Sequence, residues 1–260
     1  MFIFIPPSES KAVPSDAAPT ELGSLVLPEL TETRRVLRDS LIRLCGGPAQ
    51  DALGVLGLSA GQAGELAHNQ ALATAGAGAA ADVYAGVLYD PFGLPALRER
   101  GLALDHVLIF SGLWGVLRPG DRIAHYRCTA GVKLPGVGSV STAWRAALRE
   151  PLAAHVGDEL VVDLRSGAYA VHWQPGGNAV TVRVLQEYQA GGRTVRKVIS
   201  HFNKATKGRL ARALVESGQH PAKPKEFVDL VRDLGFTVEP GPEPTKASSP
   251  TPLDIVVSEL

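Results

Sequence analysis

Three short apolar runs most constrain how this chain can fold, because each is followed at once by a polar turn. The runs are Phe2–Ile5, Val107–Phe110 and Leu160–Leu164. Continuous apolar runs of this length are typical of strands that are covered on both faces of a sheet. Polar groups held at the end of a rigid strand are common sites of chemistry. The repeated pattern predicts that the three strands deliver Lys11, Ser111, Arg127 and Ser166 into one cleft.

The turn after the first strand supplies three candidate residues. Pro6 and Pro7 end strand pairing and stiffen the polar segment that follows. In an enzyme, Glu9 would act as general base or acid and Lys11 would hold a phosphate, with Ser8 beside them in the pocket. The alternative is an ordinary strand exit with no chemical role.

The second run opens a stretch from Leu108 to Arg127 that has the marks of an anion site. Gly112 and Gly115 let the backbone turn tightly after Ser111, a third candidate catalytic residue, and approach another group closely. Arg127 follows a further turn and is a candidate phosphate ligand. The alternative is a strand, a loop and surface arginines. The pocket residues expected here and after the third run are Trp114, Tyr126, Ser166 and Tyr169.

Apolar residues also recur at helical spacing. In the first such segment, from about Glu29 to Leu44, Arg34 is expected to lie off the buried stripe. Ser59 and Gln62 have the spacing of a capping box. Further helices are predicted at 49–56, 59–73, 95–100, 141–148, 204–216 and 225–234, and strands at 180–184, 193–202 and 236–238, with a hairpin turn at Gly191-Gly192. Helices and strands without strict alternation indicate an α+β fold, with an irregular mixed sheet flanked by helices.

The segment from Asp82 to Asp90 combines aspartates and tyrosines around a glycine. Asp82 and Tyr84 could line a pocket. A strand with one solvated face explains the same pattern equally well, and the sequence leaves both readings open.

Positive charge is concentrated between Arg183 and Arg212, which we call the cation-rich region. It holds one acid, Glu187, although Lys+Arg and Asp+Glu are 26 each over the whole chain. A basic hairpin followed by a basic helix is suited to a phosphate backbone. The alternative is a solvated charged face. The candidate phosphate- or DNA-binding residues of this region are Arg193, Arg196, Lys197, Lys204, Lys207, Arg209 and Arg212.

Several features place the chain in a broad class. Two cysteines, far apart and without metal-type spacing, suit a reducing cytoplasm. No apolar stretch approaches the roughly 18 residues that span a bilayer. The sequence predicts a soluble, cytoplasmic protein without a metal site or a cofactor. Residues 1–239 are expected to form one domain, and residues 240–260, rich in Pro, Ser and Thr, a flexible tail.

Five motifs occur in the order and spacing found in the YaaA family of bacterial peroxide stress resistance proteins. They are PPSESK, DVYAGVLYD, SGLWGVLRPGDRIAHYR, VVDLRSGAY and VISHFNKATKGRLAR. The chain resembles this family from Phe2 to about Leu234. The resemblance implies an unusual α+β fold, binding to DNA, and protection of DNA by limiting free intracellular iron. It also implies a helix-hairpin-helix element, for which Gly112–Gly115 is the candidate hairpin.

Two hypotheses follow. In the first, the cation-rich region binds duplex DNA and shields it under peroxide stress. In the second, the protein is an enzyme that acts on a nucleotide or nucleobase in the cleft. The sequence has no Walker A loop, no GxGxxG fingerprint and no Glu-x-x-His pair of the ferritin type. The two hypotheses differ in whether the polar residues converge on one cleft or spread over a convex face.

Overall fold

Strand β1 (Phe2–Ile5) lies at the centre of the main sheet. It pairs in parallel with β3 (Val107–Ser111) on one side and with β8 (Val161–Asp163) on the other. Ile3, Phe4 and Ile5 are fully buried, as the apolar run predicts. Because the three strands are parallel, their carboxyl ends meet at the same edge of the sheet.

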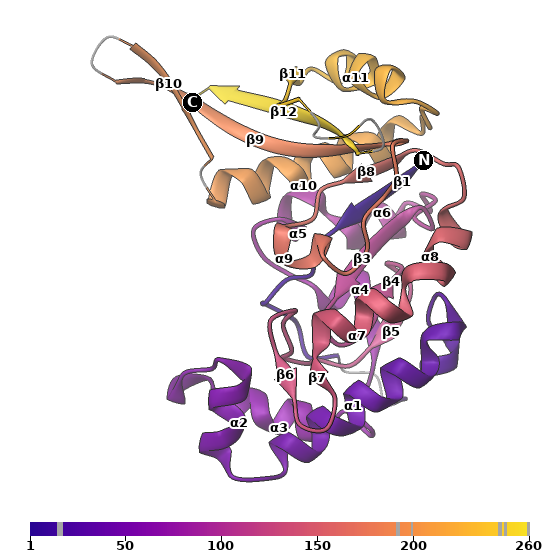
Figure 1. The fold of residues 1–260 in the computed structure, drawn as a ribbon, viewed down its shortest axis with the longest axis vertical. Helices are drawn as coiled ribbons and strands as arrows, with labels where there is room; N and C mark the ends of the chain where they lie inside the picture. The colour runs from indigo at the N-terminus through magenta and orange to yellow at the C-terminus, as the bar shows by residue number, and fades with distance from the viewer. Residues whose placement is uncertain (15–17, 191–192, 199, 244–245, 247–248, 259–260) are drawn as a thin grey trace.

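The main sheet has eight strands in the order β11-β12-β9-β8-β1-β3-β4, and β10 pairs with β9 off this path (Figure 1). The remaining bounds are Gly115–Leu117 for β4, Ala179–Ala190 for β9, Arg193–Lys197 for β10, Thr237–Pro240 for β11 and Thr251–Ser258 for β12. The five strands from β12 to β3 are parallel, whereas β4, β10 and β11 pair antiparallel. The predicted α+β class, with a mixed sheet flanked by helices, is confirmed.

The computed structural model describes the whole chain except residues 15–17, 191–192, 199, 244–245, 247–248 and 259–260. The hairpin turn predicted at Gly191-Gly192 therefore lies outside the described residues. So do the side chains of a few neighbours, among them Arg193.

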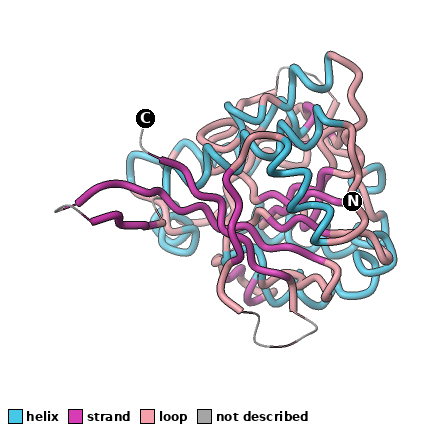
Figure 2. The backbone as a smooth tube through the Cα atoms, turned by 90° about the horizontal axis from the view of Figure 1, so that it is seen from above, coloured by secondary structure: helices cyan, strands magenta, loops and turns pink. Residues whose placement is uncertain are grey.

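Helices surround the strands (Figure 2). The helices are α1 (Thr31–Cys45), α2 (Ala49–Leu56), α3 (Gly64–Gln70), α4 (Ala80–Val83), α5 (Tyr89–Phe92), α6 (Leu94–Glu99), α7 (Val140–Ala147), α8 (Arg149–Val156), α9 (Gly167–Ala170), α10 (Ser200–Ser217) and α11 (Pro224–Asp233). Two small ribbons, β2–β5 (Gly78–Ala79, Arg122–Ile123) and β6–β7 (Lys133–Leu134, Gly138–Ser139), complete the fold. The capping box of Ser59 and Gln62 is present.

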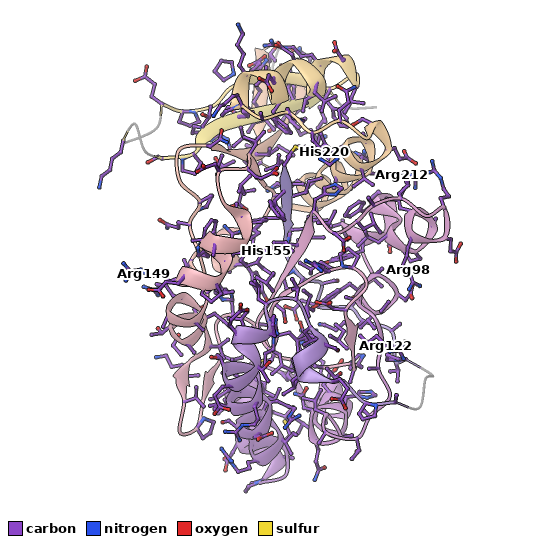
Figure 3. All side chains as sticks on the ribbon, turned by 90° about the vertical axis from the view of Figure 1, so that its right-hand side faces the viewer. Arg98, Arg122, Arg149, His155, Arg212 and His220 are labelled. Carbon is purple, nitrogen blue, oxygen red and sulfur yellow. The ribbon has the colours of Figure 1, made fainter. Side chains whose placement is uncertain are left out.

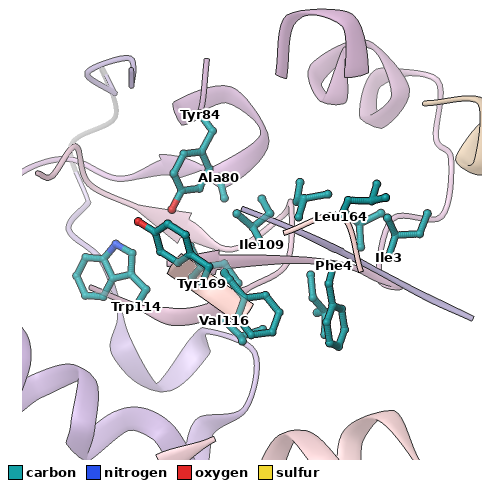
Figure 4. Close-up of a cluster of buried hydrophobic side chains, with 14 of the residues drawn as sticks. Ile3, Phe4, Ala80, Tyr84, Ile109, Trp114, Val116, Leu164 and Tyr169 are labelled. Atoms are coloured by element: carbon teal, nitrogen blue, oxygen red, sulfur yellow. The ribbon is translucent and has the colours of Figure 1, made fainter. Parts of the chain in front are cut away.

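The core is continuous across the central strands, and Figure 4 shows Phe4, Ile109 and Leu164 together in it. The rings of Phe4 and Phe110 lie 5.0 Å apart. The Arg165 guanidinium lies over the Phe110 ring, 4.0 Å from its centroid, and pairs with Asp163 at 2.6 Å. A buried charge pair therefore closes the end of β8 against the core.

Arg34 corrects the sequence analysis, because it is fully buried and does not lie on the solvent side of α1. Its guanidinium donates to the carbonyl oxygens of Leu27, Val26, Trp114 and Val116. Burial lowers the pKa of Arg34 to about 10. The periodicity of the apolar residues could not reveal this role, since all four acceptors are backbone carbonyl groups and two of them lie 80 and 82 residues away in the chain.

Three further expectations differ from the structure. The segment Asp82–Asp90 contains the short helices α4 and α5, so the strand, one of the two readings left open there, is wrong. Helix α7 begins at Val140, before the predicted 141–148, and is capped by Ser139, whose Oγ accepts from Thr142 N at 3.3 Å. Gly112–Gly115 joins the two strands β3 and β4, so it is not the hairpin between two helices.

The predicted flexible tail is wrong for Thr251–Ser258. These residues form β12, which lies between β9 and β11 in the sheet. Leu253 and Ile255 are buried, and Asp254 pairs with Arg183 at 2.6 Å. The composition of 240–252 is that of a linker, but the apolar residues after it complete the sheet.

Truncation after Pro250 is expected to lower the free energy of unfolding by at least about 3 kcal/mol, because three buried aliphatic side chains and an interior strand of the sheet are lost. Urea unfolding of the truncated chain measures this change. The control is Lys246→Ala, an exposed side chain in the loop before β12, which is expected to leave the urea midpoint unchanged. An unchanged midpoint in the truncated chain would contradict the placement of β12.

Candidate functional site

A pocket of about 420 Å³ opens at the carboxyl ends of β1 and β8. The chain leaves β1 toward β3 on one side, and it leaves β8 toward β9 on the other. Such a point, where neighbouring parallel strands send the chain in opposite directions, is where open α/β sheets bind ligands. We call this hollow the β1–β8 pocket.

Four segments line the β1–β8 pocket. The turn after β1 contributes Pro6, Pro7, Ser8, Glu9 and Ser10, and the segment before α5 contributes Gly86, Val87, Leu88 and Tyr89. The end of β8 contributes Leu164, Ser166 and Tyr169, and α10 contributes Asn203, Lys204 and Lys207. The pocket thus combines apolar and aromatic walls with a few polar and cationic groups, as small-molecule sites do.

Lys207 is the buried cation of this pocket, with 8% of its surface exposed. Its Nζ donates to the carbonyl oxygen of Leu164 at 3.1 Å. Burial lowers the pKa of Lys207 to about 8, against a smaller opposing effect of Asp163. Lys204, one turn earlier, is exposed. The Oδ1 atom of Asn203 is buried without a hydrogen-bond partner, which leaves a free acceptor in the wall.

Gly208 allows α10 to bring these residues against the turn before α5. A Cβ atom at this position would lie 2.1 Å from the carbonyl oxygen of Leu88 and 2.9 Å from Pro91 Cγ. Any larger residue would therefore push α10 away from the Gly86–Tyr89 wall. The glycine in the basic helix has a packing role that its sequence context does not reveal.

Glu9 and Arg127 form an ion pair beside the pocket. Arg127 Nη2 lies 2.6 Å from Glu9 Oε2, and Nη1 donates to the Glu9 carbonyl oxygen at 3.1 Å. The buried side chain of Asn69, on α3, accepts from Arg127 N at 2.8 Å and donates to Arg127 O at 2.9 Å. Asn69 thereby fixes the backbone of Arg127, whose side chain holds Glu9. Arg127 does not itself line the pocket.

Lys11 is held under the same turn. Its Nζ donates to Ser8 O at 2.6 Å and lies 4.4 Å from the centre of the Tyr126 ring. Burial is the main reason that the pKa of Lys11 falls to about 8, and Arg127 lowers it further while Glu9 raises it. Lys11 is therefore close to Glu9 and Arg127, but it does not line the pocket.

Ser111, Tyr126 and Tyr84 form a buried hydroxyl chain. Ser111 Oγ lies 2.6 Å from Tyr126 Oη, which lies 2.7 Å from Tyr84 Oη. Ser111 Oγ also accepts from Leu113 N and Trp114 N at 3.2 and 2.9 Å, and Ser111 is fully buried. In this arrangement Ser111 caps the turn after β3 and does not reach the pocket.

The remaining predicted residues lie in other places. Asp82 pairs on the surface with Arg98, which is labelled in Figure 3, and does not line the pocket. Trp114 is fully buried in the core (Figure 4). Of the candidate catalytic and pocket residues, the structure brings four into the pocket wall: Ser8, Glu9, Ser166 and Tyr169.

The cation-rich region does not form one free basic face. Acids pair with three of its arginines. Arg183 pairs with Asp254 and Arg196 with Glu239, both from distant parts of the chain. Arg196 also pairs with Glu187 of the region itself, and Arg212 pairs with Glu216 one turn further along α10. Lys197 and Arg209 are exposed, and Arg209 donates to Thr206 Oγ1 at 3.1 Å. Lys204 and Lys207 belong to the pocket. The local scarcity of acids in the sequence is therefore offset by the fold.

Sequence reasoning missed Asn69 and Asn203. Asn203 precedes Lys204 and lies one helical turn before Lys207, so the i, i+4 spacing of Asn203 and Lys207 was the available signal. For Asn69 there was no local signal, because its partner is the backbone of Arg127, 58 residues away in the chain.

Two kinds of feature are absent from the described residues. No three side chains among His, Cys, Asp and Glu come close enough there to hold a metal ion. In the same parts of the chain, no helix combines the length and the apolar character that crossing a bilayer requires.

The family model described as peroxide stress protein YaaA matches residues 1–241, which include every residue that lines the β1–β8 pocket. The chain belongs to the YaaA family. It is similar to a UPF0246 protein of Streptomyces coelicolor, with 47% identity over 266 residues and the full length of both chains covered. A UPF0246 protein of Corynebacterium efficiens is 43% identical, with 92% of this chain and 95% of that protein covered.

Membership of the YaaA family supports a role in peroxide stress, since the family carries that description. The match to the Streptomyces protein extends over the whole chain and so includes β12, which lies beyond the residues matched by the YaaA family model. The strand that corrects the predicted tail is therefore within a region of shared sequence.

The lowered pKa of Lys207 predicts a specific pH response. Lys207 takes up its proton at about pH 8 in the folded protein, whereas an ordinary lysine does so near 10.5. Between these values the unfolded chain binds more protons, so the free energy of unfolding rises with pH. From pH 7.5 to 9.5, wild type should gain about 2 kcal/mol more than Lys207→Met.

Urea unfolding of both proteins at the two pH values measures this difference. Lys204→Met, which removes an exposed lysine of the same helix, is the control and should keep the response of the wild type. The same response in Lys207→Met as in wild type would show that burial of Lys207 does not shift its titration.

Proposed function

We propose that this YaaA-family protein serves the peroxide stress response by binding a nucleotide in the β1–β8 pocket. The nucleotide is either free or an exposed unit of a single DNA strand, since the recognised chemistry is the same. One observation carries the proposal: Lys204 and Lys207 line the same pocket as Glu9, Ser166 and Tyr169. The polar residues thus converge on one hollow, which favours the small-ligand hypothesis over a convex basic face.

Each part of the nucleotide has a matching group. The ammonium groups of Lys204 and Lys207 bind the phosphate, and the partial desolvation of Lys207 strengthens that attraction. The base packs against the apolar and aromatic wall of Pro7, Tyr89 and Tyr169. The free Oδ1 acceptor of Asn203 receives an N–H group of the ligand.

Glu9 is the residue through which a reaction would proceed. It is the only one of the tentative catalytic residues Glu9, Lys11 and Ser111 that lines the pocket. Its side chain is about half exposed, and the ion pair with Arg127 holds its carboxylate in a fixed position. In an enzyme that acts on a nucleotide or nucleobase, Glu9 is the general base, and Lys11 and Arg127 orient it.

Calorimetric titration with AMP tests the proposal. We expect the double variant Lys204→Ala/Lys207→Met to bind AMP at least about tenfold more weakly than wild type, because two charge-assisted contacts are lost. Arg209→Ala, which removes an exposed cation of the same helix outside the pocket, is the matched control and should bind as wild type.

The two sources of the nucleotide are separated by competition with single-stranded oligothymidylate. Displacement of AMP by the oligonucleotide indicates that the pocket accepts a unit of a DNA strand, and no displacement indicates a free nucleotide. Equal AMP affinity in wild type and the pocket variant would overturn the proposal.

Duplex DNA is the second candidate ligand, and the shape of the β9–β10 ribbon favours it. The ribbon projects from the body of the molecule in both views (Figures 1 and 2). It carries Arg193, Arg196 and the exposed Lys197, and α10 follows with the exposed Lys204 and Arg209. We propose that duplex DNA binds to these cations without sequence preference. Limiting free intracellular iron is part of the same proposed protection of DNA.

The salt dependence of binding distinguishes this second candidate. Backbone contacts make log affinity fall linearly with log salt, with a slope of about −0.9 per phosphate neutralised. Lys197→Ala/Arg209→Ala should reduce that slope for duplex DNA and leave AMP binding unchanged, whereas Lys207→Met should do the reverse. Absence of duplex binding at low salt would remove this candidate.

A further inference from the structure

A second hollow, of about 730 Å³, lies where α7 and α8 meet the loop after α9. It shares none of its described lining residues with the β1–β8 pocket. The helices contribute Thr142, Arg145, Ala146 and Arg149, and the loop contributes Val171, His172, Trp173 and Gln174. We call it the α7–α8 site.

The helical wall presents two arginines to this hollow. Leu148, between the two helices, itself has helical φ and ψ, so Arg145 and Arg149 keep the i, i+4 spacing of neighbours on one face. Both are exposed, and no ion pair of either is found among the described residues. Figure 3 shows Arg149 projecting from the surface, at the opposite edge of the view from Arg98 and Arg212.

This arrangement suits a phosphate group. Two guanidinium groups one turn apart repel each other. A phosphate dianion between them attracts both, and this attraction outweighs their mutual repulsion. The planar fork of arginine matches the oxygen atoms of a phosphate in paired hydrogen bonds. Arg183, Arg196 and Arg212 already form ion pairs with acidic side chains. Arg145 and Arg149 form none among the described residues, so both guanidinium groups can bind a ligand.

Trp173 supplies an aromatic surface in the opposite wall. Its ring is partly exposed and packs edge-on against Phe4, with centroids 5.8 Å apart. Its carbonyl oxygen accepts from Arg165 Nη2 at 2.8 Å, and Arg165 is locked by its pair with Asp163. The indole is therefore held in place before a ligand arrives, which reduces the entropy cost of stacking a planar ring on it.

His172 adds an unsatisfied hydrogen-bond acceptor. Its Nε2 lies 3.2 Å from Ser141 Oγ, and that hydroxyl donates its one hydrogen to Ala130 O at 2.7 Å. Nε2 must then carry the proton and donate to Ser141, which leaves Nδ1 as an acceptor. The side chain is fully buried and Nδ1 has no partner. Burial lowers the pKa of His172 to about 4, so the acceptor persists at neutral pH.

We propose that the α7–α8 site binds a second small ligand, an aromatic phosphate of the nucleoside monophosphate class. Its phosphate lies between Arg145 and Arg149, its ring stacks on Trp173, and an N–H group of the ring donates to His172 Nδ1. This proposal does not rest on the proposed function of the β1–β8 pocket. It assigns a binding site to residues that the first site leaves unused.

Tryptophan fluorescence tests the proposal, since Trp114 and Trp144 are fully buried and Trp173 alone of the three lines this hollow. Titration with AMP should quench the emission in a saturable manner. Arg145→Ala/Arg149→Ala should weaken this binding at least tenfold. The matched control is Arg43→Ala, an exposed arginine on α1, which should leave the quenching curve unchanged.

Two further variants keep the outcome independent of the first site. Lys204→Ala/Lys207→Met should retain the quenching curve even where calorimetry shows that the β1–β8 pocket no longer binds AMP. Trp173→Phe should abolish the quenching but keep the calorimetric binding at the α7–α8 site. Absence of saturable quenching, an unchanged curve in the double arginine variant, or loss of quenching in the lysine variant would each overturn the proposal.

Discussion

The position of β1 between β8 and β3 is the constraint on which the rest of the structure depends. A strand that is apolar on both faces must be covered on both sides, so β1 pairs in parallel with two neighbours. The turns that follow β1 and β8 are then adjacent at one edge of the sheet. The pocket exists because the chain leaves these two strands in opposite directions, and α10 closes the hollow only because Gly208 permits close contact with the Leu88 carbonyl.

Burial determines what the cations of this protein can do. Arg34 is fully enclosed and uses its charge to bind four carbonyl groups, so it has a structural role. Lys11 is desolvated beneath the turn that it supports, whereas Lys207 is desolvated inside the pocket. Arg183 and Arg196 pair with acids from other segments, and Arg212 pairs with Glu216 of its own helix. Charge counted along the sequence therefore overstates the free basic surface, because several of its cations are buried or paired with acids.

The sequence could predict the elements that depend on local pattern. The apolar runs identified β1, β3 and β8. Their common polar turns predicted that Lys11, Ser111, Arg127 and Ser166 reach one cleft, and of these four Ser166 lines the β1–β8 pocket. It could not predict contacts made by backbone groups of distant segments, which explain the burial of Arg34 and the role of Asn69. The sequence did not predict β12, because the residues before Thr251 have the composition of a linker. The strand forms by pairing with β9, which is distant in the chain. The glycine-rich context of Ser111 suggested a catalytic role. Its hydroxyl instead accepts hydrogen bonds from the backbone N–H groups of Leu113 and Trp114.

We propose that Lys204 and Lys207 of α10 serve the β1–β8 pocket and not a convex surface. Crystals soaked in tungstate, a heavy tetrahedral analogue of phosphate, distinguish the two, because the anion is located by its anomalous signal. We expect a tungstate peak within hydrogen-bond distance of Lys204 Nζ and Lys207 Nζ, with Leu164 and Ser166 beside it. Peaks confined to Lys197 and Arg209 on the outer surface, with the pocket empty, would contradict it.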